Sequence, residues 1–252
     1  MIELHHVSAG YGKTEILHDI SLTFAEGKIT TILGVNGCGK STLLKTLVRL
    51  LPVTSGTVAV DGVSADIFRP AELAKKIAYL PQSRNVPDMT VRQTVLHGRF
   101  AYLSYPRVYR AEDIAAAERA MRTLGIADLA GRNLSELSGG MRQKVYIATA
   151  LAQDAPAILM DEPTTSLDIG AQLRLAETIR FLSGSGKTIV LVLHDLPLAL
   201  KLSDEIAVLH EGRLLDTGTP ENILESGAIE RAYGIKIRPI RTEDGTDYIC
   251  GL

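Results

Sequence analysis

A glycine-rich turn between an apolar strand pattern and a helix pattern constrains this chain more than any other feature. The turn has the spacing of a phosphate-binding loop: glycine, four residues, glycine, lysine, then serine or threonine. Its residues are Gly34, Val35, Asn36, Gly37, Cys38, Gly39, Lys40, Ser41 and Thr42. Three glycines let the backbone point N–H groups inward, and the helix start adds partial positive charge, so the turn predicts a site for a chain of phosphates. A turn that binds nothing is the alternative, but it requires neither the lysine nor the hydroxyl.

Three side chains of this P-loop have expected roles. Lys40 should reach the terminal phosphates. Ser41 should place its hydroxyl on Mg²⁺, because this ion takes few protein oxygens together with phosphate oxygens and water. Cys38 lies among glycines at the start of the helix, where the local field predicts thiolate rather than thiol. The alternative for Cys38 is a small residue that only fills the loop.

Composition limits the class of protein. A chain of 252 residues suits one α/β core with inserted or appended pieces. The formal net charge is -2 at pH 7, without a basic stripe, so nothing supports a nucleic-acid partner. The longest purely aliphatic stretch, residues 189–193, is too short to cross a bilayer, and two cysteines give no disulfide framework. These features predict a cytoplasmic protein.

The chain order predicts an α/β fold: a P-loop NTPase core with an antiparallel β subdomain and an inserted α-helical subdomain, in a single domain over residues 1–252. Residues 1–31 have the pattern of short strands and turns in a small antiparallel sheet. Residues 83–135 have helical patterns and form the expected inserted subdomain. Residues 228–252 are a C-terminal tail in which we identify no chemistry. The apolar side chains expected on one helix face of the insert are Ile114, Ala117, Met121 and Leu124.

Polar residues follow three apolar strand patterns, where ligands of α/β sheets collect. Gln82 is expected to touch Mg²⁺ or the attacking water, with an ordinary surface glutamine as the alternative. Asp161 is expected to hold Mg²⁺ through water, and Glu162 to orient and deprotonate the water that attacks the γ-phosphate. His194 follows another buried strand, where a lone histidine is more often structural than catalytic.

Two further sites have weaker signals. Ser138 is the natural N-cap of a helix that begins with Gly139 and Gly140, and its bare N–H groups predict a second anion site. A plain capped helix is about equally compatible with that stretch. Tyr11 lies in a turn where its ring could stack on an adenine base, although an ordinary turn residue is the better explanation of Tyr11 taken alone.

Taken together, these motifs resemble those of the ATP-binding subunits of ABC transporters over nearly the whole chain. The order of the motifs is more specific than any one of them. They are the P-loop, Gln82, residues 137–141, residues 158–162, residues 166–168 and His194.

The resemblance implies roles for individual residues. Tyr11 would stack on adenine, and Gln82 would link the nucleotide to a membrane partner. Asp168 would lie at a dimer seam, and His194 would contact the γ-phosphate. Residues 138–140 of one subunit would complete the phosphate site of the other subunit, so that a symmetric head-to-tail homodimer buries two ATP.

Other stretches indicate a subtype and its partners. Residues 95–99 with Tyr102, and the turn at 218–220, are similar to importers of iron-siderophore complexes, haem or cobalamin. The implied protein is an ATPase, with ATP and Mg²⁺, at the cytoplasmic face of the membrane. It would energise a separate integral membrane permease that receives substrate from an extracytoplasmic substrate-binding protein. Met141 departs from the family, which usually has glutamine there, and a thioether donates no hydrogen bond.

Two other functions remain open at this stage. One is a soluble ABC ATPase of a cytosolic assembly machine, such as iron–sulfur cluster biogenesis, which has similar size and motifs. The other is a nucleotide-binding regulator without turnover, which the presence of both Glu162 and His194 disfavours. Specificity for the transported solute is expected to lie in the partner chains.

Overall fold

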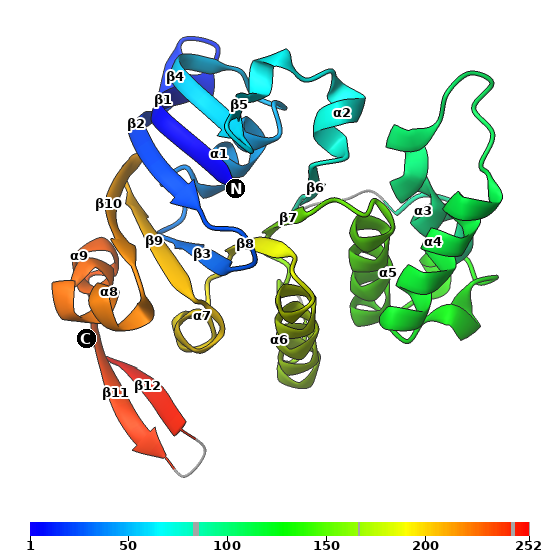
Figure 1. Ribbon diagram of the computed structural model, residues 1–252. Helices are drawn as coiled ribbons and strands as arrows, with labels where there is room; N and C mark the ends of the chain where they lie inside the picture. The colour runs from blue at the N-terminus through cyan, green and yellow to red at the C-terminus, as the bar shows by residue number, and fades with distance from the viewer. Residues whose placement is uncertain (83–85, 166, 243–244, 252) are drawn as a thin grey trace. The chain divides into compact units, whose positions relative to one another are not determined.

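The computed structural model describes residues 1–82, 86–165, 167–242 and 245–251, and it divides into two compact units (Figure 1). Unit 1 consists of Met1–Ile67 and Arg180–Leu252, and unit 2 of Phe68–Ile179. Residues 83–85, at the start of the predicted helical subdomain, lie outside the described residues. So does Ser166, which belongs to one of the motifs named above.

Unit 1 contains an antiparallel sheet of strand order β2-β1-β4-β5. Its strands are β1 (Ile2–Tyr11), β2 (Thr14–Phe24), β4 (Val53–Val60) and β5 (Val63–Ser64). A short 3-10 helix, Ala65–Ile67, follows β5. The apolar side chains on one face of β2 are buried at every second position, as the two-residue period of a strand requires: Ile20, Leu22 and Phe24. The antiparallel sheet predicted near the N-terminus is confirmed for β1 and β2. The prediction is wrong for residues 29–31, which belong to a parallel strand of another sheet.

Unit 1 also contains the strand that carries the P-loop. Strand β3 (Ile29–Leu33) pairs in parallel with β8 (Thr188–Val192) and with β9 (Glu205–His210). Strand β10 (Arg213–Gly218) pairs antiparallel with β9. Every residue of β3 and β8 is buried, which is typical of strands covered on both faces. Helix α1 (Lys40–Leu47) begins after a short loop, so the predicted strand, turn and helix are confirmed.

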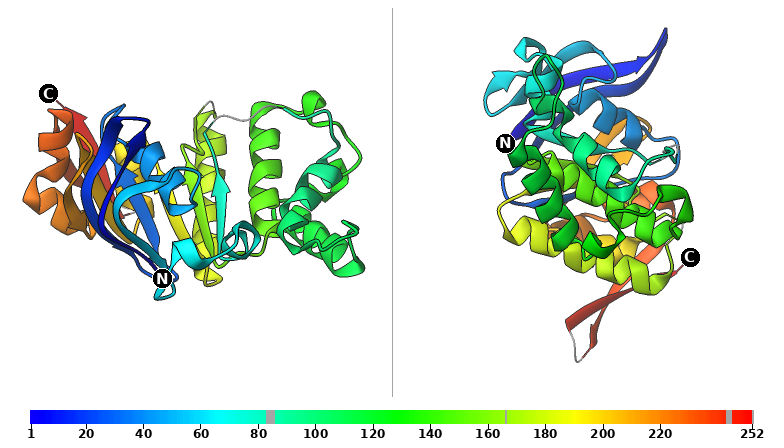
Figure 2. Two further views of the ribbon diagram at one scale, coloured as in Figure 1. Left: turned by 90° about the horizontal axis from the view of Figure 1, so that it is seen from above. Right: turned by 90° about the vertical axis from the view of Figure 1, so that its right-hand side faces the viewer.

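The C-terminal part of unit 1 is more ordered than a tail. Helices α7 (Leu196–Leu202), α8 (Pro220–Ser226) and α9 (Ala228–Tyr233) are followed by β11 (Lys236–Thr242) and β12 (Gly245–Gly251). The two strands form an antiparallel hairpin and run side by side in the right panel of Figure 2. An ion pair of 2.9 Å between Lys201 and Asp247 joins the hairpin to α7.

Unit 2 combines a pair of parallel strands with a group of helices. Strand β6 (Ile77–Leu80) follows α2 (Pro70–Ala74) and pairs in parallel with β7 (Ala157–Asp161). Helices α3 (Val91–His97), α4 (Ala111–Thr123) and α5 (Gly139–Ala152) pack against one another, as the left panel of Figure 2 shows in green. Helix α6 (Ile169–Gly184) begins in unit 2 and ends in unit 1. Short 3-10 helices span Gly98–Tyr102, Ala127–Leu129 and Leu134–Glu136.

The buried face of α4 differs from the predicted one at one position. Ala117, Met121 and Leu124 are buried as expected, but Ile114 is 42% exposed. The prediction for Ile114 is wrong because the neighbouring Asp113, only 2% exposed, points into the unit instead. A carboxylate is stable there only if it is paired and hydrogen-bonded.

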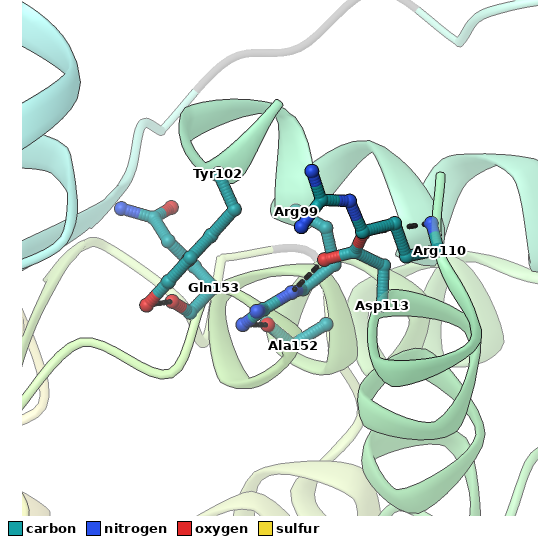
Figure 3. A network of polar contacts seen from close by, with 6 residues as sticks. All are labelled: Arg99, Tyr102, Arg110, Asp113, Ala152 and Gln153. Carbon is teal, nitrogen blue, oxygen red and sulfur yellow. Dashed lines mark hydrogen bonds and ion pairs between the residues drawn. The ribbon is translucent and has the colours of Figure 1, made fainter. Parts of the chain in front are cut away.

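Asp113 is the centre of a buried polar network (Figure 3). Its Oδ1 pairs with Nε of Arg99 at 3.0 Å, and its Oδ2 accepts a hydrogen bond from the backbone N–H of Arg110 at 3.0 Å. Arg99 also donates to the carbonyl of Ala152 at 3.1 Å and lies 3.6 Å from the ring centroid of Tyr102. Burial raises the pKa of Asp113, but the Arg110 N–H and the Arg99 guanidinium outweigh it and hold that pKa below its ordinary value. The network therefore joins the segment after α3 to α4 and α5.

Replacing Arg99 with methionine is expected to lower the free energy of unfolding by about 3–5 kcal/mol, because it leaves Asp113 buried without its charge partner. Urea unfolding measures this loss, and Arg119→Met, at an exposed position of α4, is the matched control. Since the folded-state pKa of Asp113 is lowered, the stabilisation is present above the unfolded carboxyl's pKa and is lost as the pH falls through the folded value. A loss no larger than that of the control would contradict the structural role of the pair.

Candidate active site

The P-loop in unit 1 has a backbone that only glycine adopts without strain. Gly34 has φ +152° and Gly39 has φ +105°. A Cβ on Gly34 would lie 2.5 Å from the Sγ of Cys38 and would also collide with the carbonyl oxygen of Leu209. A Cβ on Gly39 would lie 2.8 Å from a methyl group of Leu17. Both glycines are therefore required by sterics as well as by the turn.

Lys40 is the first residue of α1, and its side chain folds over the loop. Its Nζ donates to the carbonyl of Gly34 at 2.6 Å and to that of Val35 at 2.9 Å, and the residue is 6% exposed. The loop tip, residues 35–37, is exposed, whereas Thr42 in the first turn of α1 is buried. An ammonium group thus lies at the mouth of a glycine-rich turn that a helix N-terminus follows, which suits a phosphate chain.

The environment of Cys38 contradicts the predicted thiolate. The side chain is buried, with 4% exposure, and burial raises the pKa of its thiol above the ordinary value although the nearby Lys40 lowers it. Desolvation of the charged form is the larger effect, so Cys38 is a thiol at neutral pH. Its position fits the alternative of a small residue that fills the loop.

Tyr11 and His194 also belong to unit 1. Tyr11 ends β1 and is 48% exposed, and Lys45 of α1 lies 5.8 Å from its ring centroid. The ring is therefore close to the helix that begins at the P-loop. His194 is exposed and lies two residues after the end of β8, next to Asp195, whose Oδ1 caps α7.

Unit 2 brings three predicted residues together. Gln82 and Glu162 are joined by a hydrogen bond of 2.6 Å from the amide Nε2 to the carboxylate Oε2. The hydroxyl of Thr165 donates to the same carboxylate oxygen at 3.1 Å. Asp161 ends β7, is 2% exposed and accepts a hydrogen bond of 3.3 Å from the phenol of Tyr79. Sequence reasoning found neither Tyr79 nor Thr165, because only the fold places them beside the carboxylates.

Glu162 has a backbone conformation unusual for its residue type. Its φ of +50° lies in the left-handed region, where a side chain with a Cβ is strained. Residues held in such conformations concentrate at active sites, where the surrounding structure compensates for the strain. Two donors on one oxygen, the amide of Gln82 and the hydroxyl of Thr165, hold the carboxylate in this position.

Ser138 and Asp168 line one cavity of about 690 Å³ in unit 2. Ser138 is the N-cap of α5, as predicted, and its Oγ accepts from the N–H of Met141 at 3.4 Å. Gly139 and Gly140 form the first turn of α5 and line the same cavity. Asp168 accepts a hydrogen bond of 2.7 Å from the N–H of Ala171 in the first turn of α6. Two helix starts therefore open onto one cavity.

The oxygen donors expected for Mg²⁺ are hard ligands of the kind that this ion prefers. They are the hydroxyl of Ser41, the amide oxygen of Gln82 and the buried carboxylate of Asp161. Within residues 1–82, 86–165, 167–242 and 245–251, no group of three or more His, Cys, Asp or Glu side chains could hold a metal ion. A Mg²⁺ ion that takes most of its ligands from phosphate and water does not need such a group.

Comparison with known families gives one match over more than half of the chain. A family model described as ABC transporter matches residues 17–165, which include the P-loop, Gln82, residues 138–140 and both strand-end carboxylates. Among the residues that the structure describes, no helix is long and apolar enough to span a bilayer.

Three curated relatives are ATP-binding proteins of import or transport systems. The ferric enterobactin transport ATP-binding protein FepC of Escherichia coli is 39% identical over 91% of this chain and 86% of its own length. The petrobactin import ATP-binding protein YclP of Bacillus subtilis is 37% identical over 97% of this chain and 96% of its own. The cobalamin import ATP-binding protein BtuD of Halobacterium salinarum is 39% identical over 89% of this chain and 56% of its own.

A solved structure has a similar fold. The dimeric structure of MJ0796, a bacterial ABC transporter cassette, superposes with a TM-score of 0.75 and 29% identity, over 87% of this chain and 99% of that one. The similarity extends over both compact units, because it covers most of the chain.

Proposed function

This chain belongs to the ABC transporter family of ATP-binding proteins, and from this premise we propose that it hydrolyses MgATP to power the import of an iron–siderophore complex. The observation that carries the proposal is the P-loop, with its two sterically required glycines and the Lys40 ammonium above it. The names of the relatives FepC and YclP support a siderophore as cargo. Cobalamin is the second candidate, which the relative BtuD supports.

Each predicted residue has a role in this proposal. The P-loop, residues 34–42, binds the phosphates of ATP through the backbone N–H groups after Gly34 and through the Lys40 ammonium, and Tyr11 stacks on adenine. Asp161 and Ser41 hold Mg²⁺, which supplies positive charge that stabilises the phosphates during transfer. Glu162 accepts the proton of the attacking water.

Gln82 and His194 orient the groups at the γ-phosphate. Gln82 is suited to this because its amide already donates to the carboxylate of Glu162. A change at the Mg²⁺ ion or at a membrane partner that moves Gln82 would therefore alter the orientation of the base. This hydrogen bond supports the proposed link between the nucleotide and the membrane partner.

The proposal includes partners. Two copies of the chain form a head-to-tail dimer in which residues 138–140 of one subunit approach the ATP of the other, and the cavity shared by Ser138 and Asp168 supports this arrangement. The dimer binds an integral membrane permease at the cytoplasmic face of the membrane. A separate extracytoplasmic protein delivers the substrate to that permease.

Uptake by intact cells tests this function. We expect inactivation of the gene in its own host to abolish uptake of one radiolabelled metal chelate, tested as ferric siderophore, cobalamin or haem. The intact gene should restore uptake and Glu162→Gln should not, because hydrolysis supplies the energy. Amino-acid uptake is the control. Unchanged uptake of all three chelates would exclude the proposed import function.

A further inference from the structure

A tyrosine near the C-terminus contacts the first residue of the P-loop. Tyr233 is the last residue of α9, in the part of the chain where the sequence indicated no chemistry. Its hydroxyl oxygen accepts a hydrogen bond of 2.7 Å from the backbone N–H of Gly34, 199 positions earlier in the chain. Both residues lie in unit 1.

The backbone of Gly34 is fixed from several directions at once. Its N–H donates to Tyr233, and its carbonyl accepts from the Nζ of Lys40 at 2.6 Å. Its α-carbon is enclosed by Leu209 and Cys38, which leave no space for a Cβ. The hydrogen bond to Tyr233 is therefore one of the contacts that fix the peptide plane from which the P-loop begins, and the one that a C-terminal side chain supplies.

The phenol of Tyr233 is suited to act as a permanent acceptor. Burial raises the pKa of Tyr233 to about 12, so the hydroxyl is neutral throughout the physiological range. Phenylalanine occupies nearly the same space but has no oxygen, and it would leave the Gly34 N–H without its acceptor. A buried N–H that loses its acceptor turns toward another one, because an unsatisfied amide is unfavourable.

We propose that Tyr233 is a positioning residue for the P-loop, through which helix α9 sets the affinity for the phosphate chain of the nucleotide. The inference rests on the proposed phosphate site at residues 34–42. Tyr233 acts on the orientation of Gly34, and hence on how the following N–H groups converge on the phosphates. Tyr233 does not touch the reacting atoms, so its loss should weaken binding of the nucleotide equally in the ground state and in the transition state.

An interaction of this kind changes KM and leaves kcat nearly constant. We expect Tyr233→Phe to raise both the KM for MgATP and the calorimetric Kd by about five- to tenfold, with kcat within about twofold of wild type. A tenfold change corresponds to about 1.4 kcal/mol, which is the size of one net hydrogen bond. Tyr248→Phe is the matched control, because Tyr248 is also a partly buried phenol of unit 1.

Three outcomes would overturn the inference. The first is an unchanged KM and Kd in Tyr233→Phe, and the second is an equal change of KM and Kd in Tyr248→Phe. The third is a lower Tm in Tyr233→Phe with an unchanged KM, which would indicate a structural role only. KM does not depend on the active fraction of the preparation, so partial misfolding does not obscure the result.

Lys40→Ala in the same titrations separates the proposed role of Tyr233 from the proposed phosphate site. Normal MgATP binding by Lys40→Ala would refute the phosphate site itself. If Lys40→Ala loses MgATP binding and Tyr233→Phe binds MgATP like the wild type, only the role of Tyr233 is refuted.

Discussion

Replacing Glu162 with glutamine is expected to slow ATP hydrolysis by about 10²–10⁴-fold, which is the usual contribution of a general base. Glutamine keeps the shape of the side chain and an oxygen that can accept from Gln82 and Thr165, but it takes up no proton. Binding of MgATP should persist, because the P-loop and Asp161 are intact. Release of phosphate over time and calorimetric binding of MgATP measure the two quantities.

The matched control is Glu112→Gln, at an exposed position in the first turn of α4. It should hydrolyse ATP at the wild-type rate. Near-normal turnover by Glu162→Gln would refute the assignment of the base. Size exclusion adds a test of the dimer, because unhydrolysed ATP should hold two copies of the variant together. If Glu162→Gln hydrolyses ATP slowly but stays monomeric with MgATP, the result would support Glu162 as the general base and contradict the proposed dimer.

Replacing Lys40 with alanine is expected to remove both ATP binding and hydrolysis. It deletes the one side-chain positive charge that we assign to the phosphates within the P-loop. Loss of one preorganised donor to a developing charge lowers rates by about 10²–10³-fold in other enzymes. We therefore expect kcat/KM to fall by at least roughly that factor, and the change is measured by steady-state phosphate release.

Two controls separate charge from stability. Lys28→Ala removes an exposed lysine just before β3 and should leave kcat/KM unchanged. Thermal unfolding of Lys40→Ala shows whether loss of the bonds to Gly34 and Val35 lowers the Tm. Wild-type turnover by a folded Lys40→Ala would contradict the P-loop assignment.

The local elements of the site could be predicted from sequence because their determinants are close together in the chain. The glycine spacing specified the turn before α1, and the apolar run before Asp161 specified a buried strand. The N-cap at Ser138 followed from one hydroxyl before a helix pattern. The roles of these residues with ATP stay predictions.

What could not be predicted depends on contacts between distant segments. Periodicity assigned Ile114 to the core, because it could not show that Arg99 would stabilise a buried carboxylate at the preceding position, Asp113. The helix start predicted a thiolate at Cys38, but burial of its own side chain has the larger effect on its pKa. Tyr233 carried no motif, and only the folded chain brings its hydroxyl to Gly34.

The two bonds of Lys40 to its own loop make nucleotide binding an exchange rather than an addition. Two of the three N–H donors of the ammonium group are held by the carbonyl oxygens of Gly34 and Val35, so a second hydrogen bond to a phosphate requires it to give up at least one of them. The affinity gained through Lys40 is therefore the difference between two sets of hydrogen bonds. For the same reason, a ligand gains no affinity by replacing these carbonyl oxygens if it accepts hydrogen bonds from the ammonium group less strongly than they do.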